Sequence, residues 1–258
     1  MQIVPIFFFI FMILASIFSD KDNSMPVAEM KPTLRLSDSV QWSYSGTEGP
    51  EHWGELSSAF KTCSSGMEQS PVNFSADAKT RFGGLEFHYN KSPLRIINNG
   101  NSIDVNYAPG SYVLINGKQF NLVQFHIHHP GEHTIDGVST DMELHLIHED
   151  DKKNLAVVGV FLERGTLNPY MKPFWDNLPE TLGEEITVPG ETINAEFFLP
   201  LNREYFSYPG SLTTPPCKEG VQWFVMKNPV DISVHRLSQF RNHILFNSRP
   251  VQDLNGRL

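Results

Sequence analysis

Four of the chain's ten histidines crowd into the eleven-residue segment VQFHIHHPGEH. His126 and His128 are separated by one residue, and Gln124 lies two residues before His126. In a β-strand, side chains at positions i and i+2 point to the same face. The segment therefore predicts a strand that presents two imidazoles and one amide on a single face.

A second segment, MELHLIHED, repeats this spacing with Glu143 two residues before His145. If the two segments form neighbouring strands, the imidazoles of His126, His128 and His145 converge on one point. Neutral imidazole nitrogen is a good ligand for Zn²⁺, and three protein ligands with a fourth position left to water are typical of catalytic zinc. We therefore interpret the two segments as a candidate zinc site.

The residues two positions before the histidines strengthen this interpretation. A zinc-bound histidine donates its other N–H group to an acceptor, which fixes its tautomer. Gln124 can accept from His126, and Glu143 can accept from His145. One H-x-H pattern is a weak signal, but two strands with an acceptor at the same offset favour a metal site. The remaining histidines of the two segments lie off the liganding faces or beyond a turn and are predicted to be structural: His129, His133 and His148.

Most of the chain has the pattern expected of the strands that would carry this site. Short segments with alternating apolar residues recur, and Gly, Pro and Asn separate them. Asn-Asn-Gly-Asn and Ile-Asn-Gly-Lys are typical of turns between strands. Helical patterns are confined to residues 167–178, which contain prolines, and 234–245. With no linker-like break, residues 40–258 are predicted to form a single mostly β domain with a few peripheral helices.

The N-terminal residues have a different character. The first 19 residues contain no charged side chain, which indicates a secretory signal peptide. A membrane anchor is the alternative, because no basic residue precedes the apolar run, no clear cleavage site follows it, and its length approaches that of a bilayer span. Residues 20–39 are polar and are predicted to be a linker. Both interpretations predict an exported protein, periplasmic or secreted, or held at the membrane by the anchor.

Charge and cysteine content restrict the partners and the compartment. A formal charge of −9 argues against a nucleic-acid partner, because no basic surplus exists to neutralise phosphates. The two cysteines, Cys63 and Cys217, can pair in an oxidising compartment. Two buried free thiols are the alternative.

Nine motifs extend these patterns in order along the chain after residue 40: WSYSG, QSPVN, LRIINNG, LVQFHIHHPGEH, MELHLIH, LAVVGVFLERG, YFSYPGSLTTPPC, VQWFVMK and FNSRPVQDLNGR. With these motifs the sequence closely resembles the α-class carbonic anhydrases, and the short HHPGEH connection resembles bacterial and plant-type members. The resemblance implies a large twisted, mainly antiparallel sheet of about ten strands with a few short peripheral helices. It also implies Zn²⁺ on His126, His128 and His145, and a disulfide between Cys63 and Cys217.

The resemblance further implies roles that spacing alone does not supply. Thr213 is expected to accept a hydrogen bond from a zinc-bound hydroxide and to donate its own proton to Glu132. Thr214 is expected to help hold bicarbonate, and the backbone carbonyl of Asn247 to orient His128. An apolar wall for carbon dioxide is expected from five residues: Ile147, Val157, Leu212, Val221 and Trp223.

The implied activity is reversible hydration of carbon dioxide to bicarbonate and a proton by the zinc-bound hydroxide. The expected partner is this small-molecule substrate, together with the membrane if the N-terminal segment is an anchor, and the chain is expected to be a monomer or a dimer. Fast members carry a proton-relaying histidine after NNG, whereas this chain has Asn101, whose amide does not titrate near neutral pH. Asp104 is a poor substitute, because a carboxyl has a reference pKa of about 3.9. We therefore expect slow proton transfer.

Two alternative functions are weighed against this one. A zinc hydroxide can also cleave activated esters, which we expect only as a side activity. A non-catalytic binding module of the same family is the other alternative. The three histidines, Thr213 and Glu132 are all retained, which argues against it.

Overall fold

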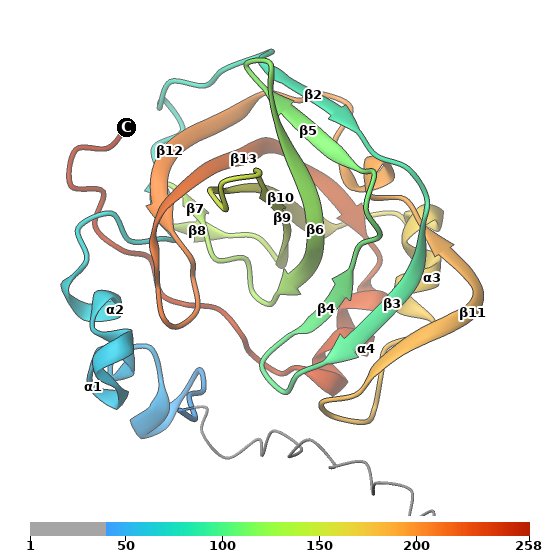
Figure 1. The fold of residues 1–258 in the computed structure, drawn as a ribbon, viewed down its shortest axis with the longest axis horizontal. Helices are drawn as coiled ribbons and strands as arrows, with labels where there is room; N and C mark the ends of the chain where they lie inside the picture. Colours follow the sequence, from blue (N-terminus) through green and yellow to red (C-terminus); the bar gives the residue numbers. More distant parts are fainter. Residues whose placement is uncertain (1–39) are drawn as a thin grey trace, which may run out of the picture. The chain divides into compact units, whose positions relative to one another are not determined.

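A ten-stranded sheet dominates the described part of the chain, residues 40–258 of the computed structural model (Figure 1). The predicted leader, residues 1–19, and linker, residues 20–39, lie outside the described residues. The main path of the sheet runs β11-β3-β4-β6-β9-β10-β13-β12, and β5 pairs with both β2 and β6. Its strands are β2 (Leu85–His88), β3 (Ser92–Asn98), β4 (Ile103–Asn106), β5 (Tyr112–Ile115), β6 (Lys118–His128), β9 (Met142–Glu149), β10 (Leu155–Arg164), β11 (Glu185–Ile193), β12 (Tyr205–Ser211) and β13 (Glu219–Ile232).

Every strand pairing in this sheet is antiparallel except that of β10 with β13. The predicted fold class, a large mainly antiparallel sheet with few short helices, is confirmed. A second, three-stranded sheet contains β1 (Asn73–Phe74), β7 (Thr134–Ile135) and β8 (Val138–Ser139). The α-helices are α1 (Trp53–Leu56), α2 (Thr62–Ser65), α3 (Lys172–Trp175) and α4 (Val234–His243), and short 3-10 turns add Gly46–Glu48, Ser58–Phe60, Pro169–Met171 and Ala195–Phe198. Within residues 40–258, none of these helices has the length and apolarity needed to cross a membrane.

Alternation along β6 determines which way its polar side chains point. Phe125 and Ile127 are fully buried in the larger of two apolar clusters that involve the sheet. A shift of one residue would expose this pair and bury its polar neighbours, so the apolar face fixes the register. The intervening residues, Gln124, His126 and His128, are thereby turned to the opposite face of the sheet.

The two predicted turns are present. Asn116 and Gly117 have positive φ of 50° and 82° and connect β5 to β6, where Ile115 pairs with Lys118. Asn and Gly tolerate this left-handed conformation, which two-residue hairpins require. Gly100, with φ of 90°, lies in the turn between β3 and β4.

The alternating apolar segments account for most strands of the ten-stranded sheet but not for β11 and β12. Both lie at the ends of the main strand order, and each contains a Pro-Gly pair, Pro189-Gly190 or Pro209-Gly210. Proline lacks a backbone N–H donor and is therefore tolerated mainly on edge strands. Pro-Gly pairs are typical of turns, but here they lie within edge strands, each of which pairs with one other strand of the sheet.

Candidate metal centre

The three histidines predicted as ligands meet where β6 and β9 lie side by side. Antiparallel pairing places His126 opposite His145 and His128 opposite Glu143. The ring centroids of His126, His128 and His145 are separated by 4.8 Å, 5.4 Å and 4.6 Å. One nitrogen from each ring lies within 4.8 Å of the other two. These spacings allow one ion to contact all three rings.

Hydrogen bonds on the far side of each ring decide which nitrogen is free. His126 Nδ1 lies 2.9 Å from Gln124 Oε1, His128 Nδ1 lies 2.6 Å from the backbone oxygen of Asn247, and His145 Nε2 lies 2.9 Å from Glu143 Oε1. Because all three partners are acceptors, these ring nitrogens carry the protons. The lone pairs therefore lie on Nε2 of His126, Nε2 of His128 and Nδ1 of His145.

One of these nitrogens is buried without a partner. Within residues 40–258, His128 Nε2 has no hydrogen bond, and the His128 side chain is fully buried. Orphaned buried polar atoms are rare in proteins and call for an explanation such as an ion. A metal cation coordinated by the three free nitrogens would satisfy this atom, so the donor set fits zinc.

Electrostatics keep the imidazoles in the neutral form that binds metal. Burial lowers the pKa of His126 well below its ordinary value, and the nearby His128 and His145 lower it further. Burial lowers the pKa of His128 to about 4, against the hydrogen bond to Asn247. Burial also lowers the pKa of His145, against the opposing effect of Glu143. At neutral pH no proton competes with a metal for these rings.

A second cluster, His133 with Glu143 and His145, also brings potential ligand atoms together. Glu143 Oε1 accepts from His133 Nδ1 at 2.7 Å and from His145 Nε2 at 2.9 Å, and Oε2 accepts the backbone N–H groups of Glu132 and His133 at 2.9 Å and 2.8 Å. Burial alone would raise the pKa of Glu143, but the two histidines lower it well below its ordinary value. This carboxylate is already fully hydrogen-bonded and is better suited to support His145 than to bind an ion.

Glu132 is buried, and one of its two carboxyl oxygens has no hydrogen-bond partner among residues 40–258. Its Oε1 accepts the backbone N–H of Arg249 at 2.9 Å, whereas Oε2 has no hydrogen bond of normal geometry to any residue from 40 to 258. Burial raises the pKa of Glu132 to about 7, and His145, the Arg249 N–H and the Thr213 hydroxyl offset part of the rise. Thr213 is itself buried. A proton at Glu132 Oε2 is therefore easily gained or lost near neutral pH.

A cavity of about 110 Å³ opens onto His126 and His128. Five predicted site residues, Asn101, Gln124, His126, His128 and Thr214, are among those that line it: Trp42, Tyr44, Asn99, Asn101, Ser102, Asp104, Gln124, His126, His128 and Thr214. The reference pKa assumed for Asp104 needs correction. Burial raises its pKa, although hydrogen bonds from Ser102 and Asn99 offset part of the rise.

The five residues of the predicted apolar wall belong to one cluster. Val157, Val221 and Trp223 are almost fully buried in it, whereas Ile147 and Leu212 pack against it and remain half-buried. The ring centroids of Trp223 and His145 are 4.9 Å apart. Ile147 and Leu212 therefore offer accessible apolar surface, and the other three support it as core residues.

Cys63 and Cys217 form a disulfide, as predicted. Cys217 donates its N–H to the backbone oxygen of Thr214 at 2.8 Å. The disulfide therefore holds Cys217, and with it the turn that carries Thr213 and Thr214, against the segment that contains Cys63.

His133 is the main site residue that the sequence did not indicate. It is fully buried, and its Nε2 lies 2.6 Å from the Tyr208 hydroxyl, which is 2.8 Å from Ser70 Oγ. Through Glu143 this chain of hydrogen bonds reaches His145. The crowding of histidines in HHPGEH was the only signal, because strand periodicity ends at Pro130.

Comparisons with known proteins agree with this geometry. A family model described as eukaryotic-type carbonic anhydrase matches residues 48–258. A carbonic anhydrase from Nostoc sp. is 44% identical over 224 residues, which cover 85% of each chain. The α-carbonic anhydrase of Thermovibrio ammonificans, solved with the inhibitor sulfanilamide, matches with a TM-score of 0.81 and 41% identity, over 85% of this chain and 98% of that one. Dioscorin, solved with ascorbate, has a TM-score of 0.77 at 28% identity, over 84% of this chain and 95% of that one.

Proposed function

Because this chain belongs to the eukaryotic-type carbonic anhydrase family, we propose that it hydrates carbon dioxide reversibly at a zinc ion held by His126, His128 and His145. The observation that carries the proposal is the convergence of three unprotonated imidazole nitrogens, one of them buried without a partner among the described residues. Bound there, zinc supplies a Lewis acid that makes hydroxide available from water at neutral pH, a property well known for this family.

Glu132 and Thr213 would orient the reacting groups by controlling one proton. A nearby dication favours the charged form of a carboxyl, so metal loading would lower the pKa of Glu132 from about 7. An ionised carboxylate only accepts hydrogen bonds. Thr213 must then donate its proton to Glu132 Oε2 and can only accept a hydrogen bond on its other side. The pair thus selects for a nucleophile that carries a proton to donate.

Ile147 and Leu212 would provide the surface against which carbon dioxide rests. Both are half-buried members of the cluster that contains Trp223. An uncharged molecule loses little hydration on apolar surface, whereas charged bicarbonate is poorly held there. Thr214, on the polar lining of the cavity, would offer a hydroxyl to the product.

Proton release would be slow, because the cavity holds few groups able to carry a proton at neutral pH. Asn101, Asn99 and Thr214 do not titrate in this range, and Asp104 is the only carboxyl among the described residues that line the cavity. Burial raises the pKa of Asp104 and so brings this one carboxyl closer to neutral pH, but hydrogen bonds from Ser102 and Asn99 offset part of the rise. We therefore expect proton transfer to depend on external buffer.

Export is the second part of the proposal. The disulfide between Cys63 and Cys217 is typical of proteins that fold in an oxidising compartment. Together with the uncharged N-terminal segment it supports a periplasmic or secreted enzyme.

The decisive experiment measures carbon dioxide hydration by stopped flow before and after removal of zinc with a chelator. We expect activity to disappear on chelation and to return in proportion to added zinc, approaching one ion per chain. Full activity in metal-free protein would refute the proposal. Ester hydrolysis in the same preparation shows whether that activity is only a side reaction.

A further inference from the structure

One edge of β6 is paired with β4, and this pairing ends just before His128. β4 pairs with β6 only from Gln124 to His126. Beyond that point the backbone groups on this edge would be buried without partners, at a cost comparable to a lost hydrogen bond for each group. They are bonded instead by one residue from the C-terminal part of the chain, Asn247.

Asn247 binds the backbone on both sides of His128. Its Nδ2 donates to the Ile127 oxygen at 3.0 Å, and its Oδ1 accepts the His129 N–H at 2.7 Å. Its own backbone N–H donates to the His129 oxygen at 3.0 Å. Asn247 is fully buried. The residue thus continues the ladder of hydrogen bonds that β4 leaves unfinished.

We propose that the side-chain amide of Asn247 is a positioning group that holds His128 in the orientation required for metal binding, an inference that rests on the proposed function of the three-histidine site. The amide fixes Asn247 relative to β6, and the backbone oxygen of the same residue lies 2.6 Å from His128 Nδ1. The carbonyl that selects the His128 tautomer is therefore aimed by hydrogen bonds to Ile127 and His129. Removal of a group that orients a metal ligand typically weakens metal binding by roughly 10- to 100-fold.

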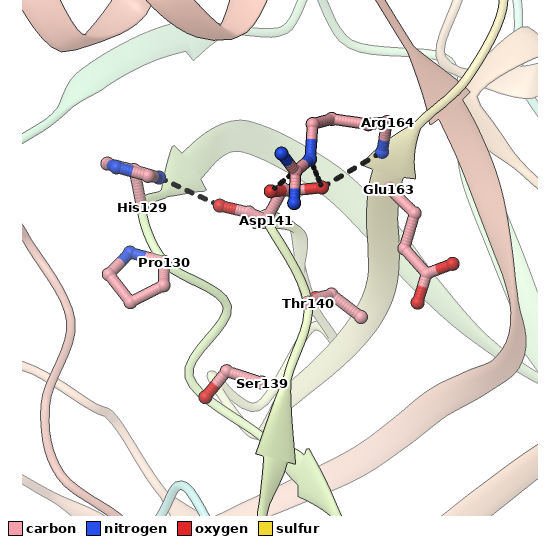
Figure 2. A pocket seen from close by; sticks show the side chains of 7 residues that line it. All are labelled: His129, Pro130, Ser139, Thr140, Asp141, Glu163 and Arg164. Carbon is pink, nitrogen blue, oxygen red and sulfur yellow. Dashed lines mark hydrogen bonds and ion pairs between the residues drawn. The ribbon is translucent and has the colours of Figure 1, made fainter. Parts of the chain in front are cut away.

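His129, whose backbone N–H binds the Asn247 amide, is also held by its own side chain. His129 Nδ1 lies 2.8 Å from the backbone oxygen of Asp141. The Asp141 carboxylate in turn accepts the backbone N–H and the Nε–H of Arg164 at 3.0 Å and 3.1 Å. Figure 2 shows these contacts along the wall of a cavity of about 430 Å³, with the His129 ring directed toward Asp141. Asn247 therefore binds a backbone segment that is also held by Asp141 and, through Asp141, by Arg164 at the end of β10.

A buried asparagine that binds backbone groups stabilises any fold, so the test must separate stability from metal binding. Asn98 offers a matched control. It is buried, its Nδ2 donates to the Pro179 oxygen at 3.2 Å and its Oδ1 accepts the Gly100 N–H at 3.0 Å. Neither contact involves a histidine of the metal centre.

The experiment compares Asn247→Leu, Asn247→Ala and Asn98→Leu with the wild-type chain. Each Asn247 variant keeps the backbone oxygen that faces His128 and removes only the amide. We measure the zinc dissociation constant by competition with a chromophoric chelator, the thermal unfolding of zinc-free protein, and the visible spectrum of the Co²⁺-substituted protein. We expect both Asn247 variants to bind zinc roughly 10- to 100-fold more weakly and to change the cobalt spectrum. Asn98→Leu should lose zinc-free stability but keep its zinc affinity within about twofold.

The outcomes separate this inference from the proposed function. Zinc affinity within about twofold of wild type in Asn247→Ala, with an unchanged cobalt spectrum, overturns the positioning role whether or not Asn247→Leu folds. Equal losses of zinc affinity in the Asn98 and Asn247 variants overturn it as well, because stability alone would explain both. A wild-type chain that binds no zinc would instead overturn the proposed function.

Discussion

His148 lies buried on β9, three residues beyond His145, on the face of the sheet away from the metal centre. Its Nε2 lies 2.6 Å from the Tyr89 hydroxyl, and within residues 40–258 its Nδ1 has no hydrogen bond. Burial lowers the pKa of His148 from 6.5 to about 4, although nearby backbone groups of Ala156 and Leu146 offset part of the fall. The folded chain therefore keeps this ring neutral at pH values where the unfolded chain protonates it.

This difference makes the free energy of unfolding depend on pH in a calculable way. The pKa of His148 is lower in the folded chain than in the unfolded chain. Its titration therefore costs no unfolding free energy above pH 6.5, and the free energy of unfolding falls as the pH drops below that value. The loss at pH 5 is about 2 kcal/mol, and it levels off at about 3 kcal/mol below the folded pKa of about 4. Replacement of His148 by glutamine removes this term, since the amide does not titrate but can still accept from Tyr89.

The assay is urea unfolding of zinc-free wild-type and His148→Gln protein at pH 7.5 and pH 5. Other titrating groups contribute equally to both chains, so the difference in unfolding free energy isolates His148. We expect this difference to move by about 2 kcal/mol in favour of the variant when the pH is lowered. His88→Gln, a change at an exposed histidine of β2, should follow the wild-type chain. A difference that stays constant between the two pH values would refute the reasoning.

Three further predictions concern the metal centre. Glu143→Ala should fold but bind zinc roughly 10- to 100-fold more weakly, because His145 loses its acceptor; unchanged affinity in a chelator competition would contradict this role. Thr213→Ala should keep zinc yet lose roughly a hundredfold in kcat/KM for hydration, an effect of the size seen when one orienting donor is removed; a wild-type rate by stopped flow would argue against it. The hydration rate at low buffer should rise with added imidazole and in Asn101→His, and a rate indifferent to both changes would mean that another group carries the proton.

Strand periodicity accounts for the part of the site that could be predicted from the sequence. The i, i+2 spacing placed Gln124, His126 and His128 on one face of β6, and the same spacing placed Glu143 and His145 on one face of β9. It also indicated most strands of the main sheet. Local spacing was sufficient for His126 and His145, because the acceptor of each ring lies on the same strand, whereas the acceptor of His128 is Asn247.

Residues that reach the site from elsewhere in the chain leave no such pattern. His133 follows a proline turn, where side-chain direction no longer alternates. The Arg249 N–H meets Glu132 across 117 residues, and no local rule predicts that contact. Asp104 illustrates a second limit: its burial, which raises its pKa, depends on how β4 packs and not on its residue type.

The parallel pairing of β10 with β13 has a consequence for how the chain is made. β13 begins at Glu219, and β13 is the strand of the main sheet with which β12 pairs, so neither strand can join the sheet until the residues of β13 have left the ribosome. Asn247 follows later still. A nascent chain that ended at Ile232 would carry all three histidines but lack the backbone oxygen of Asn247 that lies 2.6 Å from His128 Nδ1, so the site cannot be complete until Asn247 has been synthesised.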